Sequence, residues 1–351
     1  MNPLVTLCVP TYNRAGFLRE SLAAIRGQTH EPLEILIADN ASTDETQRIC
    51  ETAADEDARI RYIRHPQNIG LYPNHNFCID HARGEYLCFF HDDDWYGPGL
   101  VARYAEFLQA HPDAGLVCAD WDLMDDDGRV FAKRRSKAPL VQSGAAYTER
   151  TIRSGRSSLN CPGVCIRRRA LGDIRFDEKG PIGFGDFVVW FQVGEQWSIG
   201  HLAQALWRYR IHRGSLSRRT ILGMAGDYEK AVGAYLESRQ ARRPSERPLI
   251  VRWKRLMQRY IFWSLVYEVC RHLRNTPAAG DKTLFDAIGY RLTDAELSQA
   301  RQLLDRHRSS SLEHLVLHMI EKLIDRRWTG PLSWASRRIS ISWARAVLRL
   351  R

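Results

Sequence analysis

The chain has 351 residues and a mass of 40.5 kDa, a length that suits one large or two medium domains. Its composition, with 44% hydrophobic and 26% charged residues, is that of a globular protein and excludes a disordered or fibrous one. No apolar run approaches the roughly 20 residues that span a bilayer, and residues 1–10 lack the basic segment and cleavage site of a secretory signal. We therefore expect neither a transmembrane nor a secreted protein.

The net charge of +10 is divided unevenly along the chain. Residues 1–200 hold 22 basic and 28 acidic residues, whereas residues 201–351 hold 29 basic and 13 acidic residues. The acidic half suits metal or polar-substrate chemistry, and the basic half suits an anionic surface, either membrane phosphate or nucleic acid.

The eight cysteines are scattered along the sequence. Even the closest pair, Cys161 and Cys165, is weak support for zinc, so we expect buried, reduced thiols in a cytosolic protein.

In chain order, strand-like and helix-like segments alternate through the first 120 residues. Apolar runs predict strands at 4–9, 33–38, 60–63, 86–90 and 115–119. Apolar residues at helical spacing predict helices at 17–25, around Ile49, at 77–82 and at 101–108. This alternation predicts a mostly parallel sheet, in which ligands bind at the carboxyl ends of the strands.

Polar clusters follow three of the predicted strands, at residues 11–14, 39–44 and 92–94. The three adjacent carboxylates at 92–94 repel one another unless a hard divalent cation with oxygen ligands neutralises them. The alternative is a solvated acidic turn. By contrast, residues 125–128 end in glycine and follow no comparable strand, so they predict a hairpin or loop turn.

Four linked motifs carry a family resemblance: residues 9–14 (VPTYNR), 37–44 (IADNASTD), 68–70 (NIG) and 84–86 (GEY) leading to 92–95 (DDDW). Further motifs follow at 163–168, 176–178, 185–187 and 209–212. Over about residues 3–218 this pattern resembles glycosyltransferase family 2. The resemblance implies a GT-A fold, a Rossmann-like mixed and mostly parallel sheet flanked by helices, at residues 1–222. A basic helical region is expected at 223–351.

The resemblance implies an inverting, metal-dependent hexosyl- or deoxyhexosyltransferase. It would move a sugar from a nucleotide diphosphate sugar, UDP or dTDP favoured, to a hydroxyl of a glycan or polyprenyl-linked acceptor in bacterial surface polysaccharide (O-antigen) synthesis. Asp186 would be the general base, Asp93 and His212 the ligands of Mn²⁺ or Mg²⁺. The implied nucleotide- and donor-binding residues are Pro10, Thr11, Tyr12, Arg14, Asp39, Asn68, Gly70, Asp92 and Asp94.

Two positions depart from the family pattern. His91 stands where the metal motif usually has its first acid, and Gly185 replaces the glutamate before Asp186. Structural alternatives also stand beside the implied roles: Asp186 suits a helix N-cap, and a lone histidine such as His212 is more often structural than a ligand. His91 could replace an acid as a weak metal ligand or hydrogen-bond nearby.

The C-terminal region predicts helices, with capping boxes at residues 293–296 and 310–313. Residues 334–351 form a basic amphipathic segment with tryptophans, which suits an anionic membrane surface or docking on protein. We expect a cytoplasmic protein that could lie peripherally on the inner face of the cytoplasmic membrane; the sequence predicts no oligomeric state.

Two other functions compete with transfer. One is a catalytically degenerate nucleotide-binding assembly module. The other is a nucleic-acid-binding protein, which we disfavour because the basic helices carry no recognisable motif and the strand-end acids repel phosphate, so nucleic acid is not an expected partner.

Overall fold

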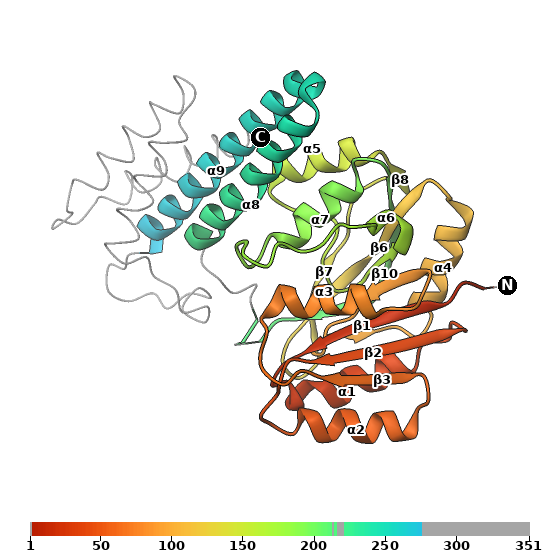
Figure 1. Ribbon diagram of the computed structural model, residues 1–351. Helices are drawn as coiled ribbons and strands as arrows, with labels where there is room; N and C mark the ends of the chain where they lie inside the picture. The colour runs from red at the N-terminus through yellow and green to blue at the C-terminus, as the bar shows by residue number, and fades with distance from the viewer. Residues whose placement is uncertain (1, 213, 216–220, 276–351) are drawn as a thin grey trace. The chain divides into compact units, whose positions relative to one another are not determined.

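The computed structural model describes residues 2–212, 214–215 and 221–275 (Figure 1). Strands and helices alternate first: β1 (Val5–Thr11), α1 (Ala15–Arg26), β2 (Leu33–Asp39), α2 (Thr46–Glu56), β3 (Ile60–Arg64), α3 (Leu71–His81), β4 (Tyr86–Phe89), β5 (Trp95–Tyr96), α4 (Leu100–Ala110) and β6 (Ala114–Met124). Every strand and helix expected in the first 120 residues is present, and the structure adds the short strand β5. Most elements extend a few residues beyond the apolar positions that predicted them.

The chain continues through β7 (Val130–Arg134), β8 (Val141–Gln142), α5 (Gly144–Ser154), β9 (Val164–Arg167), α6 (Arg168–Leu171), α7 (Gly185–Val193) and β10 (Ser198–Arg210). The helices α8 (Ile221–Arg242) and α9 (Arg247–Asn275) follow, joined by the short 3-10 helix η2 (Pro244–Glu246). The chain divides into two compact units, residues 1–218 with 230–235, and residues 219–229 with 236–351. The sequence-based boundary after residue 222 stays a prediction.

One mixed sheet of ten strands forms the first unit. Its main order is β3-β2-β1-β4-β9-β6-β10-β5, with β7 beside β6 and β8 beside β10. The strands β3, β2, β1 and β4 are parallel neighbours, as the alternating sequence predicts. Strand β9 then runs antiparallel between β4 and β6, while β10 runs parallel to β6. The sheet is therefore parallel on the side that binds ligands in related architectures and mixed beyond it.

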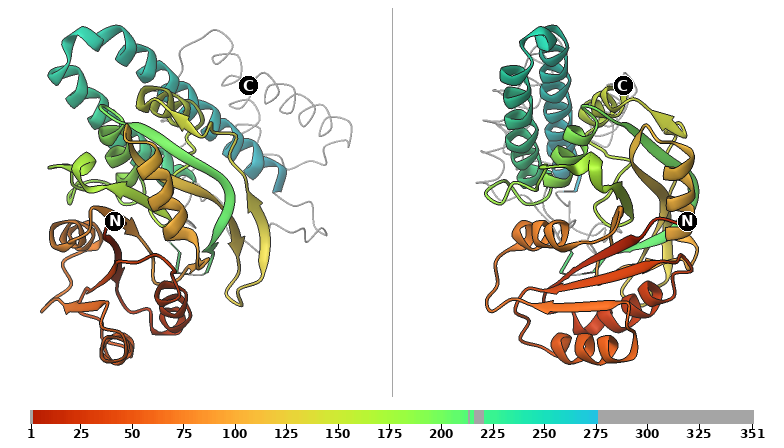
Figure 2. Two further views of the ribbon diagram at one scale, coloured as in Figure 1. Left: turned by 90° about the vertical axis from the view of Figure 1, so that its right-hand side faces the viewer. Right: turned by 45° about the vertical axis from the view of Figure 1, so that its right-hand side comes forward.

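Helices cover both faces of the parallel strands (Figures 1 and 2). α1 and α2 lie on one face of β1, β2 and β3, and α3 lies on the other. Strand β2 is buried along its whole length because it is covered on both faces, which explains its unbroken apolar run. A buried apolar core joins side chains of α1, α2 and α4 to the sheet, among them Leu22, Ile49 and Tyr104.

The acidic run 125–127 forms the predicted turn, here between the antiparallel strands β6 and β7. The Asp125 N–H donates to the Arg129 carbonyl, and Gly128 has φ +78, a left-handed conformation that favours glycine. Within the described ranges, no helix combines the length and apolar character needed to cross a bilayer. The capping boxes at 293–296 and 310–313 and the amphipathic segment 334–351 lie outside the described residues.

Candidate active site

Strands β1, β2 and β4 end at the same edge of the sheet, so the three polar clusters come together. The loops after β1 and β2 are bound to each other: the Asn13 N–H donates to Ser42 Oγ at 3.0 Å, and the Thr43 N–H donates to Asn13 Oδ1 at 2.8 Å. Asn13 and Ala41 both adopt positive φ, 51° and 62°. Left-handed backbone is uncommon outside glycine, and it often occurs at ligand-binding loops.

Asp39 ends β2 as a fully buried carboxylate. One of its oxygens accepts the Ser42 N–H at 2.9 Å, and the other accepts the Tyr62 hydroxyl at 2.8 Å. The Arg64 guanidinium lies 3.7 Å away. Asp39 therefore fixes the loop after β2 through these contacts. Its expected contact with a nucleotide base stays a prediction.

The other expected donor-binding residues surround this edge. Thr11 is buried at the end of β1, whereas Tyr12 is 44% exposed. Asn68 Oδ1 accepts from the Asn40 side chain and from the Gly70 N–H, both at 2.9 Å. Gly70 begins α3 with φ +98, which a side chain would strain. These residues shape one loop surface, and Pro10 precedes it in β1.

The acidic loop after β4, residues 91–94, is held by the far end of the sheet. Strand β5 pairs with β10, which brings the loop beside the end of β10 at Arg210. The Arg210 N–H donates to Asp94 Oδ1 at 2.8 Å, and its buried guanidinium donates to the Asp93 carbonyl at 2.7 Å. The same guanidinium reaches the Asp125 and Asp126 carbonyls and the Glu20 carboxylate. Arg210 thus joins the acidic loop, the β6–β7 turn and α1.

Burial sets the electrostatics of this loop. It raises the pKa of Asp92 to about 7, with the neighbouring Asp93 charge adding to the effect. Burial likewise raises the pKa of Asp94 well above its ordinary range. The Arg14 guanidinium lies near both Asp92 and Asp93, with its Nε 3.7 and 3.9 Å from their carboxylate oxygens. The loop therefore favours an additional positive charge.

Asp93 is the acid that stays ionised. Burial opposes ionisation, but the hydrogen bond from His212 and the nearby His91 and Arg14 outweigh it, so the pKa of Asp93 falls below its usual range. His212 Nε2 lies 3.0 Å from Asp93 Oδ2, and its Nδ1 accepts the Gly214 N–H at 3.1 Å. The proton consequently sits on Nε2 and is donated to Asp93. The structure therefore joins these two predicted metal ligands directly to each other.

Asp186 lies in the first turn of α7, which begins at Gly185. Phe184 is the N-cap residue, so the alternative in which Asp186 caps this helix is wrong. Burial raises the pKa of the Asp186 carboxyl to about 7, although the side chain keeps some exposure and accepts N–H groups of Phe187, Asp186 and Cys161. A carboxyl that titrates near neutrality is suited to general base chemistry.

Position 185, directly before Asp186, needs glycine for a steric reason. A Cβ at Gly185 would meet the Tyr72 ring at 2.5 Å, closer than any side chain can approach. Tyr72 Oη also accepts the N–H groups of Gly183 and Gly185, at 3.1 and 3.0 Å. The ring of Tyr72 thus occupies the space that a larger residue at position 185 would need, and its hydroxyl positions the start of α7.

Asp186 and the acidic loop belong to one site. The Cys161 N–H donates to the Asp186 carboxylate, and one ligand atom of Cys161 lies within 4.8 Å of a His91 ring nitrogen. His91 directly precedes Asp92 in the chain. The three-residue path Asp186, Cys161, His91 therefore connects the candidate base to the candidate metal-binding acids.

The acidic loop fits a hard divalent cation. Potential ligand atoms of His91, Asp93 and Asp94 lie within 4.8 Å of one another. Asp94 Oδ2 is buried and has no hydrogen-bond partner among the described residues, an arrangement that costs free energy unless a cation or donor reaches it. Carboxylate oxygens are the ligands that Mg²⁺ and Mn²⁺ prefer.

Comparison with known proteins agrees with this site. The family described as Glycosyl transferase family 2 matches residues 6–174, which contain the acidic loop and the loops after β1 and β2. Residues 6–174, just under half of the chain, are therefore similar to glycosyltransferase family 2. It is 27% identical over 223 residues to Glycosyltransferase GlyA of Streptococcus pneumoniae and 37% identical over 227 residues to the uncharacterized glycosyltransferase EpsJ of Bacillus subtilis. The matches cover 61% and 62% of this chain, but only 31% and 64% of those proteins, less than two thirds of either.

Solved structures share the GT-A fold with this chain. Staphylococcus aureus TarS 1–349 in complex with UDP-GlcNAc superposes with a TM-score of 0.55 at 17% identity, over 92% of this chain and 88% of that one. The mannosyltransferase PcManGT of Pyrobaculum calidifontis, in complex with GDP-Man and Mn²⁺, gives a TM-score of 0.55 at 18% identity, over 92% and 86%. The expected fold is therefore confirmed, a mixed and mostly parallel sheet flanked by helices with a helical region after it.

Some residues at this site were not singled out from the sequence. Arg210 lies in the motif at 209–212, but nothing local indicates that its side chain joins three segments. His75 and Tyr72 lie on α3 without a motif of their own. Cys161 was noted for its spacing to Cys165, yet Cys165 instead contacts Cys88 across the β4–β9 pair. These contacts depend on strand pairing between distant segments.

Proposed function

We propose that the chain is an inverting glycosyltransferase that uses a nucleotide diphosphate sugar. One observation supports this proposal most strongly. Asp186, with its pKa near 7, is connected through Cys161 and His91 to the acidic loop at the carboxyl ends of the parallel strands. Inversion needs a base on one side of the sugar and charge stabilisation of the diphosphate on the other.

The proposed chemistry uses few protein groups. The acceptor hydroxyl oxygen bonds to the anomeric carbon while the bond from that carbon to the diphosphate breaks, and the hydroxyl proton passes to Asp186. Asp186 must be ionised to accept it, which its pKa near 7 allows at neutral pH. Backbone N–H groups at the start of α7 hold the carboxylate in place.

Asp93 would hold a divalent cation, Mn²⁺ or Mg²⁺, with the unpartnered oxygen of Asp94 close to it. When bound, such an ion supplies positive charge for the departing diphosphate. His212 donates to Asp93 through Nε2 and so orients the carboxylate; it would become a ligand only after losing that proton. Arg14, beside Asp92 and Asp93, offers a further cation to the diphosphate.

For the donor and the acceptor we propose chemical classes rather than single compounds. Asp39, Thr11 and Tyr12 lie where the nucleoside would bind, and a carboxylate there suits the N–H of uracil or thymine, so UDP- or dTDP-sugars remain our preference. Hexosyl or deoxyhexosyl transfer to a glycan or polyprenyl-linked acceptor in surface polysaccharide synthesis is the proposed setting. A cytoplasmic protein lying peripherally on the membrane would fit such an acceptor.

A thermal-shift panel of UDP, dTDP, GDP, CMP and ADP, each with and without Mn²⁺, tests the proposal on the purified chain. A ligand at about 100 times its Kd adds about 2.7 kcal/mol of stability. We expect one nucleoside diphosphate to stabilise the chain, and to do so more strongly with Mn²⁺. If none does, the nucleotide-binding function is wrong.

A turnover assay with nucleotide-sugar donors, which measures released nucleoside diphosphate, separates an active transferase from a degenerate binding module. Nucleotide binding by a chain that releases no nucleoside diphosphate from any donor, with water or a glycan as acceptor, would favour the module. Release that requires both metal and Asp186 would favour the transferase.

A further inference from the structure

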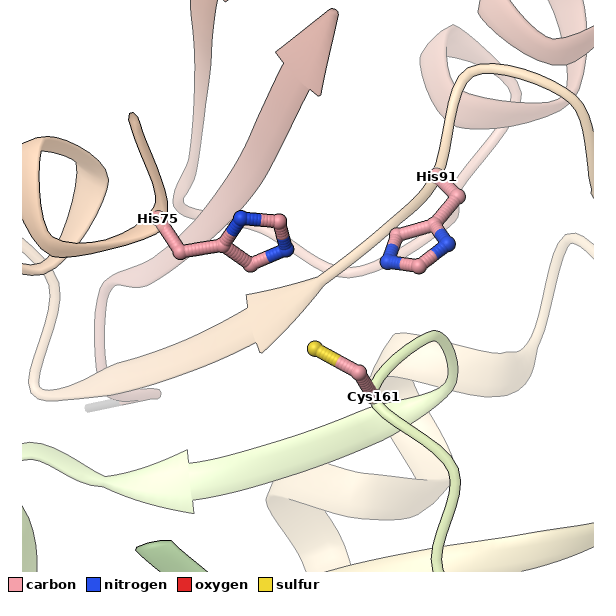
Figure 3. Close-up of side chains that lie close together, drawn as sticks. All are labelled: His75, His91 and Cys161. Carbon is pink, nitrogen blue, oxygen red and sulfur yellow. The ribbon is translucent and has the colours of Figure 1, made fainter. Parts of the chain in front are cut away.

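Three side chains that could ligate a metal converge beside the acidic carboxylates, and only one of them, His91, also lies near Asp93 and Asp94. They are His75 on α3, His91 after β4 and Cys161 before β9. One ligand atom from each lies within 4.8 Å of the other two. Figure 3 shows a ring nitrogen of each histidine and the sulfur of Cys161 pointing toward a common space.

His75 is fixed in the form that a metal site needs. Its Nδ1 lies 2.8 Å from the Leu71 carbonyl oxygen, so Nδ1 carries the proton and Nε2 carries the free lone pair. The ring is 4% exposed and packs near Phe89 and Phe176, with centroids 5.5 and 5.3 Å away. Burial also keeps this imidazole neutral, since it lowers the pKa of His75 to about 3.

His91 supplies an atom that the protein leaves unsatisfied. Its Nε2 is buried and has no hydrogen-bond partner among the described residues. A buried polar atom without a partner is destabilising until a ligand or donor reaches it. The His75 and His91 rings meet edge-on with centroids 5.9 Å apart, so their nitrogens can face one ion without stacking.

Cys161 completes the group with a sulfur atom. Its N–H is already bound to Asp186, which holds the loop before β9 in place. Burial raises the pKa of the thiol, so the free protein holds it protonated, and a metal ion would displace that proton to solvent. Metal–ligand bonds of 2.0–2.3 Å put tetrahedral ligands roughly 3.3–3.8 Å apart, which small side-chain rotations from the present spacing would reach.

We propose that His75, His91 and Cys161 bind a zinc-class transition-metal ion at a site that includes neither Asp93 nor Asp94 and shares only His91 with the acidic loop. Two imidazole nitrogens and one thiolate suit Zn²⁺ or Co²⁺, whereas Mg²⁺ prefers the oxygen atoms of the acidic loop. Three protein ligands leave the fourth tetrahedral position for a water molecule. The ion would lie between the acidic loop and Asp186. The proposal does not depend on the glycosyltransferase function.

Cobalt titration of the reduced full-length chain tests the proposal, without nucleotide or sugar. We expect one equivalent of Co²⁺ to produce a thiolate-to-cobalt charge-transfer band in the near ultraviolet and the visible bands of tetrahedral Co²⁺, both removed by Zn²⁺. Cys161→Ser should abolish the charge-transfer band. His75→Gln should weaken cobalt affinity by about tenfold or more.

Matched variants separate this site from others. His81→Ala changes an exposed histidine on the same helix as His75, and Cys50→Ser removes a different buried thiol. Asp93→Asn removes an acid of the neighbouring site. All three should keep the charge-transfer band, and circular dichroism should show that each variant is folded.

The proposal is overturned if the wild-type chain gives no thiolate band at saturating Co²⁺, or if the band survives in Cys161→Ser. Cobalt binding without a thiolate band that is lost in Asp93→Asn would also overturn it, because the ion would then occupy the carboxylate site. If Cys161→Ser does not fold, His75→Gln provides the same decision through the loss of cobalt affinity.

Discussion

Asp186→Asn tests the assignment of the base and the cause of its raised pKa in one variant. The amide keeps the size of the carboxyl and can still accept N–H hydrogen bonds, but it cannot take a proton. Loss of a general base typically lowers turnover by about 10²–10⁴-fold. Nucleotide affinity should stay close to the wild-type value, because Asp186 is not among the residues expected to bind the nucleotide.

The same variant should stabilise the fold at high pH. In the folded chain this carboxyl has a pKa of about 7, and its ordinary value is 3.8. Below about pH 4 both states are protonated and the difference vanishes; as pH rises from 4 through 7, ionisation progressively disfavours the folded state. Three pKa units correspond to about 4 kcal/mol, and the partial exposure of the side chain reduces our expectation to on the order of 1–2 kcal/mol.

The assay compares the melting temperatures of wild type and Asp186→Asn at pH 4.5 and pH 8. We expect the variant to gain stability relative to wild type between these values. Asp55→Asn, on the exposed surface of α2, removes the same formal charge and controls for net charge. A stability difference that is identical at both pH values would refute burial as the cause of the shift, and turnover near wild type would remove Asp186 as the base.

Arg210→Met should destabilise the chain by about 3 kcal/mol, measured by urea unfolding, because it leaves three carbonyls, those of Asp93, Asp125 and Asp126, and the Glu20 carboxylate without their donor; a loss below about 1 kcal/mol would contradict the tethering role. Gly185→Ala should cost about 1–3 kcal/mol through its clash with Tyr72, whereas Gly16→Ala, which meets nothing within 4 Å, should be close to neutral in the same assay. Asp93→Ala should reduce the Mn²⁺-dependent part of nucleotide stabilisation in thermal shift, and an unchanged metal effect would place the cation elsewhere. For transfer itself, kcat/KM should rise about tenfold per pH unit below pH 7 and level off above it, following the ionised fraction of Asp186; a flat profile between pH 5.5 and 7 would contradict this.

The parallel half of the fold could be predicted because its signals are local. β2 is an unbroken apolar run since both of its faces are covered, and Asp39 follows at its end. The same logic located the acidic loop after β4 and the clusters at residues 11–14 and 39–44. Parallel strands end at one edge of a sheet, so the sequence alone determined that these clusters meet.

Contacts between distant segments were decided only by the tertiary structure. Arg210 reaches the acidic loop because β10 pairs with β5, more than one hundred residues apart in the chain. The start of α7 at Gly185, rather than at Asp186, follows from packing against Tyr72. His75, His91 and Cys161 come from three segments with no shared spacing, so no sequence pattern could join them. Local periodicity determines which elements form and where their polar ends lie, whereas the convergence of single side chains depends on pairing register and packing.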